Sequence, residues 1–182
     1  MTARIARAGH EDTHMAELSP LVGIVMGSDS DAETMRRCAD QLAQFGIPCE
    51  TRILSAHRTP QAAHEYAASA AQRGLKVIVA GAGMSAALAG ALAAATTLPV
   101  IGVPVSSGPL AGVDAMVSTL QMPPGVPVAC MSIGPAGAAN AAIFAAEILA
   151  LADPALADKL RQFKQDQAAA VMKKDASLRE KS

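Results

Sequence analysis

Three short stretches of the chain carry side chains that could do chemistry together. Residues Gly27–Asp31 read GSDSD, Ser55–Arg58 read SAHR, and Ala80–Ser85 read AGAGMS. An imidazole such as that of His57 titrates near neutral pH and can give or take a proton. The guanidinium of Arg58 offers a fixed fork of donors that fits a phosphate. This pair is typical of a site that holds a phosphorylated ligand next to one proton-transfer residue.

The GSDSD stretch combines a flexible backbone with hydroxyl and carboxylate groups. Gly27 lets the backbone approach a ligand closely, because glycine has no side chain. Ser28 and Ser30 offer hydroxyls, whereas Asp29 and Asp31 offer acceptors that suit a sugar hydroxyl better than a phosphate. A helix that begins after this turn would add free N–H groups, which favour an anion. The same residues are also typical of a plain helix N-cap.

The AGAG segment could bring backbone amides to the same place. Gly81, Ala82 and Gly83 would present N–H groups to a small anion or a carboxylate. Structural interpretations stand beside these functional ones. Tight packing of a strand against a helix would also explain the glycines of AGAG. His57 could equally be an incidental loop histidine, and Arg58 could be a solvated surface arginine. Convergence of the three stretches would favour the functional interpretation.

Each stretch follows an apolar run and precedes a helical pattern. The sequence predicts strands over residues 21–26, 47–54, 75–80, 99–103 and 128–133. It predicts helices over residues 31–46, 59–74, 85–96, 112–120, 134–151 and 155–171, with Thr59 capping the second and Pro60 at its first position. This alternation implies a three-layer α/β sandwich around a central parallel sheet. The carboxyl ends of parallel strands meet at one edge, so the three stretches should converge there.

Composition narrows the class of protein. The 182 residues fit one domain, whose core must be built from small aliphatic side chains because aromatic residues make up 2% of the chain. The net charge is −1 and no basic run occurs, so no nucleic-acid partner is expected. Cys38, Cys49 and Cys130 are scattered, which favours a reducing cytoplasm over a disulfide framework. No metal site is expected, since the histidines do not cluster and HExxH is absent.

A long part of the chain is almost without charge. From Val77 to Ala146 the only charged residue is Asp114. Glycines and prolines interrupt this region, and no segment of about 20 residues is apolar throughout, so a membrane span is not expected. A monomer of this size could not hide so much uncharged surface. The sequence therefore predicts a homo-oligomer that buries this surface between subunits.

The ends of the chain differ in composition from its middle. Residues 1–19 mix charges without the apolar core of a secretory signal and are expected to be a disordered N-terminal extension. Residues 20–173 are expected to form a single α/β domain with a C-terminal helix. Residues 174–182 are polar and are expected to form a frayed tail.

At GSDSD, SAHRTP and AGAG the chain resembles the PurE family of de novo purine biosynthesis. This family comprises 5-(carboxyamino)imidazole ribonucleotide mutases, which are isomerases, and aminoimidazole ribonucleotide carboxylases. The resemblance extends from about Leu21 to Leu151 and includes LPVIGVPV, QMPPGVPV and NAAIFAAEILAL. It implies a flavodoxin-like subunit in a cytoplasmic homo-octamer that binds a small ribonucleotide. It also implies that the enzyme needs no metal or organic cofactor.

The resemblance also implies a role for each matching residue. Ser28 and Arg58 would hold the phosphate with Ser55 nearby, and Asp31 would accept hydrogen bonds from the ribose. His57 would be the general acid/base while the carbamate substrate loses carbon dioxide and its ring carbon takes this molecule up again. The backbone amides of residues 80–83 would hold the carbon dioxide. The other residues expected to bind substrate are Gly27, Asp29, Ala56, Ala80, Gly81, Ala82 and Ser85.

One stretch departs from the mutase pattern, which has AGGAAHLPG after the third strand. Ala87 stands where a histidine is usual, and Ala89 stands where a proline is usual. The carboxylases resemble this chain near Ser85 but have a lysine where it has Arg58. Arg58 therefore favours the mutase, and a carboxylase that uses carbon dioxide directly is the alternative.

Two further alternatives are functions without catalysis. A non-catalytic module that binds a phosphorylated ligand would explain the loops, but it gives no reason for His57 beside Arg58. A structural scaffold would explain the uncharged region, yet it would not need Ser28 or Asp31.

Overall fold

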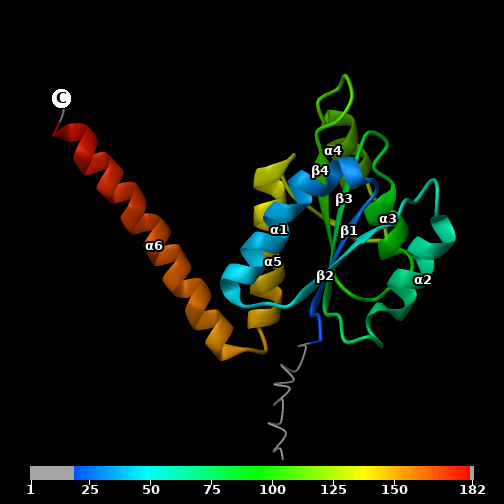
Figure 1. Cartoon of the computed structure of the whole chain (residues 1–182), viewed down its shortest axis with the longest axis horizontal. Coiled ribbons are helices and arrows are strands. Elements are labelled where there is room, and N and C mark those ends of the chain that lie inside the picture. Colours follow the sequence, from blue (N-terminus) through cyan, green and yellow to red (C-terminus); the bar gives the residue numbers. More distant parts are fainter. Residues whose placement is uncertain (1–18, 181–182) are drawn as a thin grey trace, which may run out of the picture.

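A parallel sheet of five strands forms the centre of the protein. The computed structural model describes residues 19–180. The strands are β1 (Val22–Met26), β2 (Cys49–Ile53), β3 (Val77–Gly83), β4 (Val100–Val105) and β5 (Ala129–Cys130). Their order is β2-β1-β3-β4-β5, and every neighbouring pair is parallel (Figure 1). This is the flavodoxin-like order, so the predicted fold is confirmed.

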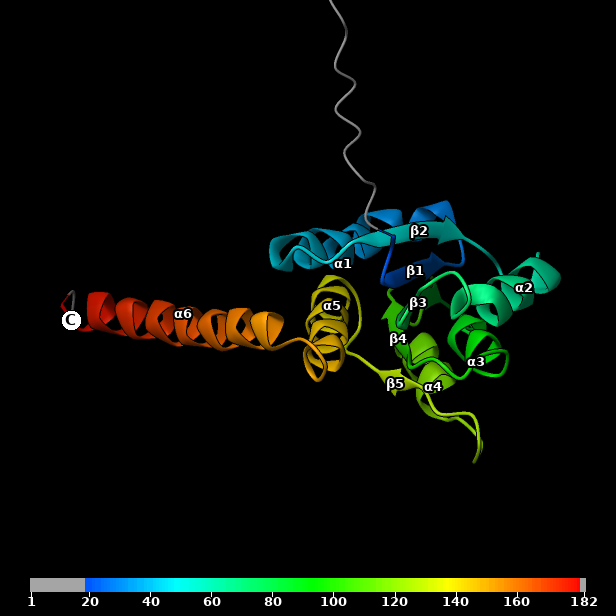
Figure 2. The same ribbon diagram turned by 90° about the horizontal axis from the view of Figure 1, so that it is seen from below.

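Helices cover both faces of the sheet and make the three layers (Figure 2). One face carries α1 (Ala32–Phe45) and α5 (Pro135–Ala150), and the other carries α2 (Pro60–Ala70), α3 (Leu88–Ala93) and α4 (Val113–Leu120). The central strands are buried on both sides, because Val77 and Val79 pack toward α1 and α5 while Ile78 and Ala80 pack toward α2 and α3. This sandwich leaves the carboxyl edge of the sheet for the loops.

Small side chains let the layers approach closely. Five alanines of α5 are completely buried against the sheet and α1: Ala138, Ala141, Ala142, Ala145 and Ala146. Gly137, in the first turn of the same helix, lies so close to the loop before it that a Cβ there would overlap the carbonyl oxygen of Ser132. The aliphatic core expected from the lack of aromatic residues is therefore realised by alanine-rich packing.

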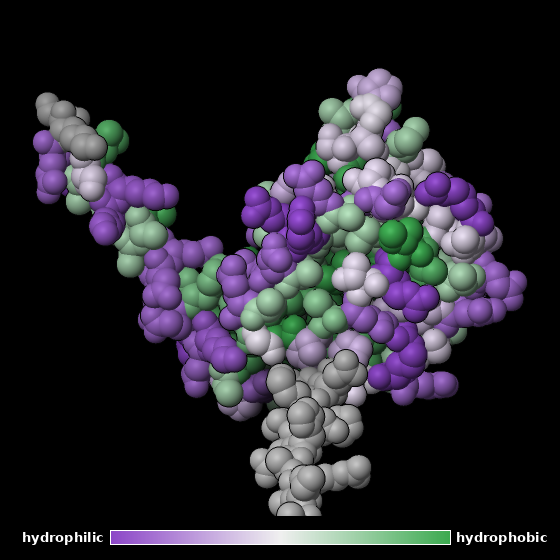
Figure 3. All heavy atoms as spheres, in the orientation of Figure 1, coloured by the Kyte–Doolittle hydropathy of each residue, from purple (hydrophilic) through white to green (hydrophobic). Residues whose placement is uncertain are grey.

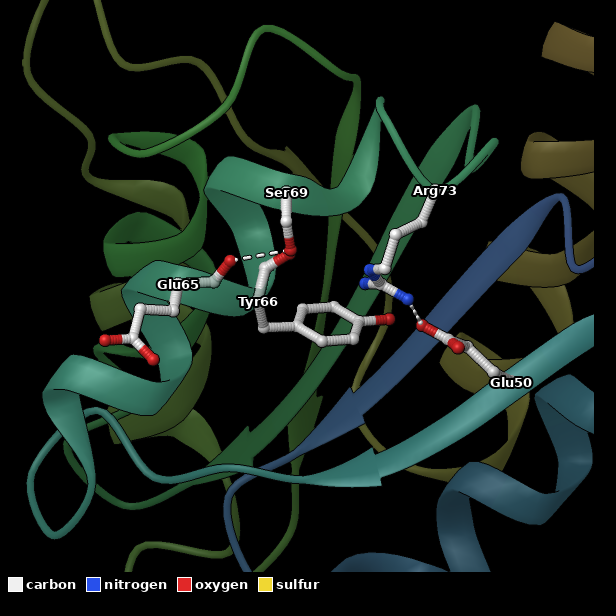
Figure 4. Close-up of polar contacts among 5 residues, drawn as sticks. All are labelled: Glu50, Glu65, Tyr66, Ser69 and Arg73. Carbon is white, nitrogen blue, oxygen red and sulfur yellow. Dashed lines mark hydrogen bonds and ion pairs between the residues drawn. The ribbon is translucent and has the colours of Figure 1, made fainter.

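The edge strand β2 is joined to α2 by a polar cluster around Tyr66 (Figure 4). The guanidinium of Arg73 lies 4.6 Å from the centre of the Tyr66 ring and donates to Glu50 on β2 over 2.6 Å. Burial raises the pKa of Tyr66. Burial also acts to raise the pKa of Glu50, but the hydrogen bond from Arg73 and its positive charge oppose this effect, and the pKa is lowered. Gly23 on β1 makes room for the phenol, because a Cβ there would overlap the Tyr66 hydroxyl.

The boundaries of several elements differ from the predicted ones. The third strand continues through the AGAG segment to Gly83, because its last residue still pairs with Val105 of β4. The helix predicted over residues 85–96 is shortened to α3, and the strand predicted over 128–133 is reduced to β5. Thr59 occupies the predicted N-cap position of α2, with Pro60 as the first helical residue, but its side chain makes no capping hydrogen bond. Its hydroxyl instead accepts a hydrogen bond from the Ser55 N–H.

The last helix, α6 (Pro154–Arg179), extends away from the sandwich (Figures 1 and 2). Only Leu156 and Leu160 are buried among its side chains, and Phe163 packs edge-on against Phe45. α6 continues to Arg179, beyond the predicted end of the last helix at residue 171, so the structure places residues 174–179 in this helix. The predicted extension lies outside the described residues, apart from residue 19. None of the described helices is long and apolar enough to cross a membrane.

Candidate active site

The three predicted loops converge at the carboxyl edge of the sheet and enclose a cavity of about 500 Å³. A fourth loop, residues 106–112 after β4, joins them. Nine of the expected residues line the cavity: Gly27, Ser28, Asp31, Ser55, Ala56, His57, Arg58, Ala82 and Ser85. Six others complete its wall: Ser30, Gly83, Met84, Ala87, Leu88 and Ser107. Topology accounts for this convergence, since β1, β2, β3 and β4 all end at this edge.

Arg58 connects the loop after β2 to the loop after β1. Its Nη2 donates to the carbonyl oxygen of Gly27 over 2.8 Å, and its backbone N–H donates to Ser55 Oγ over 3.1 Å. The Ser55 N–H donates in turn to Thr59 Oγ1 over 2.9 Å, which folds residues 55–59 into a tight turn. The guanidinium is therefore held at the mouth of the GSDSD loop with several N–H groups still unused.

The side chains of Ser28 and Asp29 accept hydrogen bonds from the backbone of the GSDSD loop. The Ser30 N–H donates to Ser28 Oγ over 3.3 Å and to Asp29 Oδ1 over 3.1 Å, and the Ser28 hydroxyl donates to Asp29 over 3.0 Å. These bonds cap the short 3-10 helix η1 (Asp29–Asp31) that leads into α1. Asp29 consequently does not line the cavity, whereas Ser28 both caps the turn and faces the cavity.

Asp31 is a buried carboxyl at the base of this loop, with 5% of its surface exposed. Burial raises its pKa, and this effect is opposed by hydrogen bonds from Ser28 and Ser30 and by the positive charge of Arg58. A Cβ on Gly27 would lie 3.8 Å from its Oδ2, so the carboxyl packs beneath the backbone that a ligand would approach. The position suits an acceptor for a hydroxyl group held inside the cavity.

Fewer residues at the end of β3 line the cavity than expected. Ala80 and Gly81 lie within the ladder and do not line the cavity, because the strand continues past them. The Gly81 carbonyl accepts a hydrogen bond from the Gly27 N–H over 3.1 Å, and buried Met35 fills the space beside its Cα. Ala82 and Gly83 do reach the cavity, and Met84 turns the chain with a left-handed φ of 56°.

His57 is exposed at the cavity wall, and its imidazole makes no hydrogen bond within residues 19–180. It is therefore available to a ligand. His64, on α2, does not line the cavity. Within the described part of the chain, no three His, Cys, Asp or Glu side chains gather as a metal site. The arrangement can hold an anion at Arg58 and move a proton at His57.

Sequence reasoning missed three of the residues that line the cavity. Met84 and Leu88 flank the AGAG segment, and Ser107 belongs to the loop after β4. The glycine-rich segment gave a signal for the first two. Ser107 stands in the unremarkable context VSSGPL, and only the pairing of β4 beside β3 brings it to the site.

Comparisons with known proteins identify the family of the chain. The model of the AIR carboxylase family matches residues 21–170. The chain is 52% identical over 161 residues to N5-carboxyaminoimidazole ribonucleotide mutase of Bacillus subtilis, covering 88% of this chain and 99% of that protein. It is 54% identical over 159 residues to the mutase of the same name from Mycobacterium tuberculosis, covering 87% and 90%.

A solved structure shares the fold. The crystal structure of Treponema denticola PurE superposes with a TM-score of 0.78 at 33% sequence identity, covering 87% of this chain and 98% of that one. The family model spans most of the domain, and the relatives are matched over nearly their whole length. The chain therefore belongs to the AIR carboxylase (PurE) family.

Proposed function

We propose that this protein is an N5-carboxyaminoimidazole ribonucleotide mutase of purine biosynthesis. It would convert 5-(carboxyamino)imidazole ribonucleotide to 4-carboxy-5-aminoimidazole ribonucleotide. The observation that carries the proposal is that one cavity is lined both by Arg58, which is bonded to Gly27, and by the exposed imidazole of His57, which has no hydrogen-bond partner within residues 19–180. The names of the relatives from Bacillus subtilis and Mycobacterium tuberculosis support it.

The cavity offers separate places for the parts of such a substrate. Arg58 binds the phosphate together with the hydroxyls of Ser28 and Ser55, which all line the same wall. Asp31 accepts from a ribose hydroxyl, which is a better partner for a buried carboxyl than a phosphate would be. The imidazole ring then lies near His57 and the end of β3.

The reaction needs one proton-transfer group and protection from water. The N–C bond of the carbamate breaks, carbon dioxide leaves, and the electron pair stays on nitrogen, which takes up a proton. The ring carbon then forms a C–C bond to the carbon dioxide and loses its own proton, so atoms and charges balance. His57 moves this proton, and the backbone around Ala82 and Gly83 holds the carbon dioxide. No strong nucleophile is required.

We also infer a homo-octamer in the cytoplasm. Support comes from an exposed apolar stripe on α4, formed by Val113, Val117 and Leu120, each about half exposed. Neighbouring Leu110 is 59% exposed. A stripe of this kind on an almost uncharged region favours contact with another subunit. The arm formed by α6, which stands clear of the body in Figure 3, offers a second surface. Native mass spectrometry of the purified chain tests the octamer directly.

The second candidate is an aminoimidazole ribonucleotide carboxylase that takes carbon dioxide directly. Ala87 and Ser85 at the cavity wall favour it, since they stand where the mutase pattern differs. Two initial rates separate the candidates. One assay supplies freshly made carbamate, and the other supplies aminoimidazole ribonucleotide with dissolved carbon dioxide. Conversion of the carbamate beyond its spontaneous breakdown supports the mutase, whereas carboxylation without any use of the carbamate supports the carboxylase.

The variant His57→Asn tests whether the site is catalytic. Turnover should fall by 10²–10⁴-fold, the usual contribution of general acid–base catalysis, while the nucleotide still binds. His64→Asn is the matched control, because His64 lies on α2 and outside the cavity. Turnover that survives His57→Asn unchanged would instead favour a site without acid–base chemistry at this residue.

A further inference from the structure

The loop after β4 places a serine against the last glycine of β3. Gly83 pairs with Val105, and the chain then turns back so that Ser107 lies beside the Gly83 Cα. A Cβ on Gly83 would overlap Ser107 Oγ and would lie 3.0 Å from its Cβ. Both residues line the cavity, and Ser107 is half-buried there. Its hydroxyl makes no hydrogen bond within residues 19–180.

The backbone N–H of Gly83 opens into the same place. Successive residues of a strand direct their N–H and C=O groups to alternate neighbours. The backbone groups of Gly81 point toward β1, since its carbonyl oxygen accepts a hydrogen bond from the Gly27 N–H. The backbone groups of Gly83, two residues further along the strand, point to the same side. Strand β1 has ended at Met26 by this point, which leaves the Gly83 N–H beyond the ladder. Two donors, one amide and one hydroxyl, therefore adjoin each other at the cavity wall.

The order of the strands fixes which part of a ribonucleotide meets these donors. Arg58 follows β2, Ser28 follows β1, Gly83 ends β3 and Ser107 follows β4, so they succeed one another along the edge. Three strand spacings separate β2 from β4, about 14 Å in all. This span fits a phosphate, a ribose and a five-membered ring in line. A phosphate at Arg58 thus directs the ring and its carboxyl group toward Gly83 and Ser107.

We propose that Ser107 is a substrate-binding residue that, with the Gly83 N–H, binds the carboxyl group that migrates. The two donors hold its oxygen atoms as carbamate, as carbon dioxide and as the carboxylate of the product. Holding the carbon dioxide against the ring carbon prevents its loss to solvent between the two steps. The inference rests on the proposed function and adds to the backbone of Gly83 a side chain, that of Ser107, which helps to retain the carboxyl group.

The variant Ser107→Ala tests this with Ser106→Ala as the matched control, since Ser106 is the exposed neighbour that does not line the cavity. Each enzyme converts the carbamate in the presence of ¹³C-labelled carbon dioxide, and the labelled fraction of the product is measured. Ser107→Ala should incorporate more label than wild type and lower kcat/KM for the carbamate about tenfold or more, because the lost contacts bind the substrate as well as the carbon dioxide. Ser107→Thr, which keeps the hydroxyl, should restore retention. The labelled fraction is a ratio, so partial unfolding does not alter it.

Equal label in wild type and Ser107→Ala, or an equal rise in Ser106→Ala, would overturn the proposal. Calorimetry adds a readout that does not depend on turnover. Ser107→Ala should weaken binding of the carboxylated nucleotide about tenfold while binding of aminoimidazole ribonucleotide stays the same. Equal weakening of both nucleotides would count against a carboxyl-specific role. Failure of the proposed function is distinct, because wild type itself would then convert no carbamate.

Discussion

Replacing Arg58 should weaken binding of the phosphate and of nothing else in the substrate. The guanidinium has five N–H donors. Nη2 uses one on Gly27 at 2.8 Å, and Nε points to Ser55 Oγ at 3.5 Å, which leaves three donors for a ligand. A hydrogen bond to a charged group contributes about 1.5–3 kcal/mol. Because Arg58 is exposed in the free protein, we take the equivalent of one such bond, so Arg58→Ala should weaken nucleotide binding about 10- to 150-fold.

The assay is a thermodynamic cycle that compares two proteins, each binding two ligands. Calorimetry measures binding of aminoimidazole ribonucleotide and of the corresponding nucleoside, which lacks the phosphate, to wild type and to Arg58→Ala. The difference between the two losses is the coupling between Arg58 and the phosphate. Arg58→Lys should show an intermediate loss, because it keeps the charge but cannot reproduce the fork that reaches Gly27.

Arg37→Ala is the control, since Arg37 is an exposed arginine of α1 that does not line the cavity. Removing its charge reports the long-range electrostatic part of the effect. If Arg58→Ala weakens the nucleoside as much as the nucleotide, Arg58 does not hold the phosphate. An equal loss in Arg37→Ala would likewise refute the argument, because it would trace the effect to net charge.

Three predictions concern stability and reactivity. Gly137→Ala should lower the free energy of unfolding by about 1–3 kcal/mol in urea titrations, because the new Cβ meets the Ser132 carbonyl. The pKa of Glu50 is lower in the folded protein than in the unfolded chain. Its ion pair with Arg73 therefore stabilises the fold fully at a pH above the unfolded-state pKa, and this stabilisation is lost as the pH falls through the folded-state pKa. Glu50→Gln should therefore cost about 0.2–1 kcal/mol at pH 7 and nothing at strongly acidic pH. Burial raises the pKa of Cys38 to about 12, so a thiol reagent at pH 8 should label it only after unfolding, as peptide mapping can show.

The family and the fold were predictable because their signals are local. GSDSD and SAHR each follow a strand directly. Because the connections between parallel strands are right-handed, the loops that follow these strands all lie at the same edge of the sheet. The cavity contains His57, Arg58 and Ser28 as a result. The oligomer predicted from the uncharged region stays a prediction, as do the roles of these residues in binding and catalysis.

The end of the last helix was predicted too early, although the cause of its continuation is also local. Residues 174–179 are rich in charge, which suggested fraying, yet lysine, alanine, leucine and arginine are good helix formers. Backbone hydrogen bonds within α6 need no tertiary partner, so the helix continues to Arg179 without burying that part of its surface.

The sequence by itself determined which loops reach the edge of the sheet, since each functional residue lies a few positions after an apolar strand. Only the tertiary structure decided which atoms of those loops face the cavity. Pairing with β4 carries β3 to Gly83 and withdraws Ala80 and Gly81 into the ladder, while the exposed Asp29 carboxylate accepts a hydrogen bond from the Ser30 N–H within η1. Ser107 enters the site through the same pairing. Such details depend on contacts between segments distant in sequence, and local patterns of residue type carry no record of those contacts.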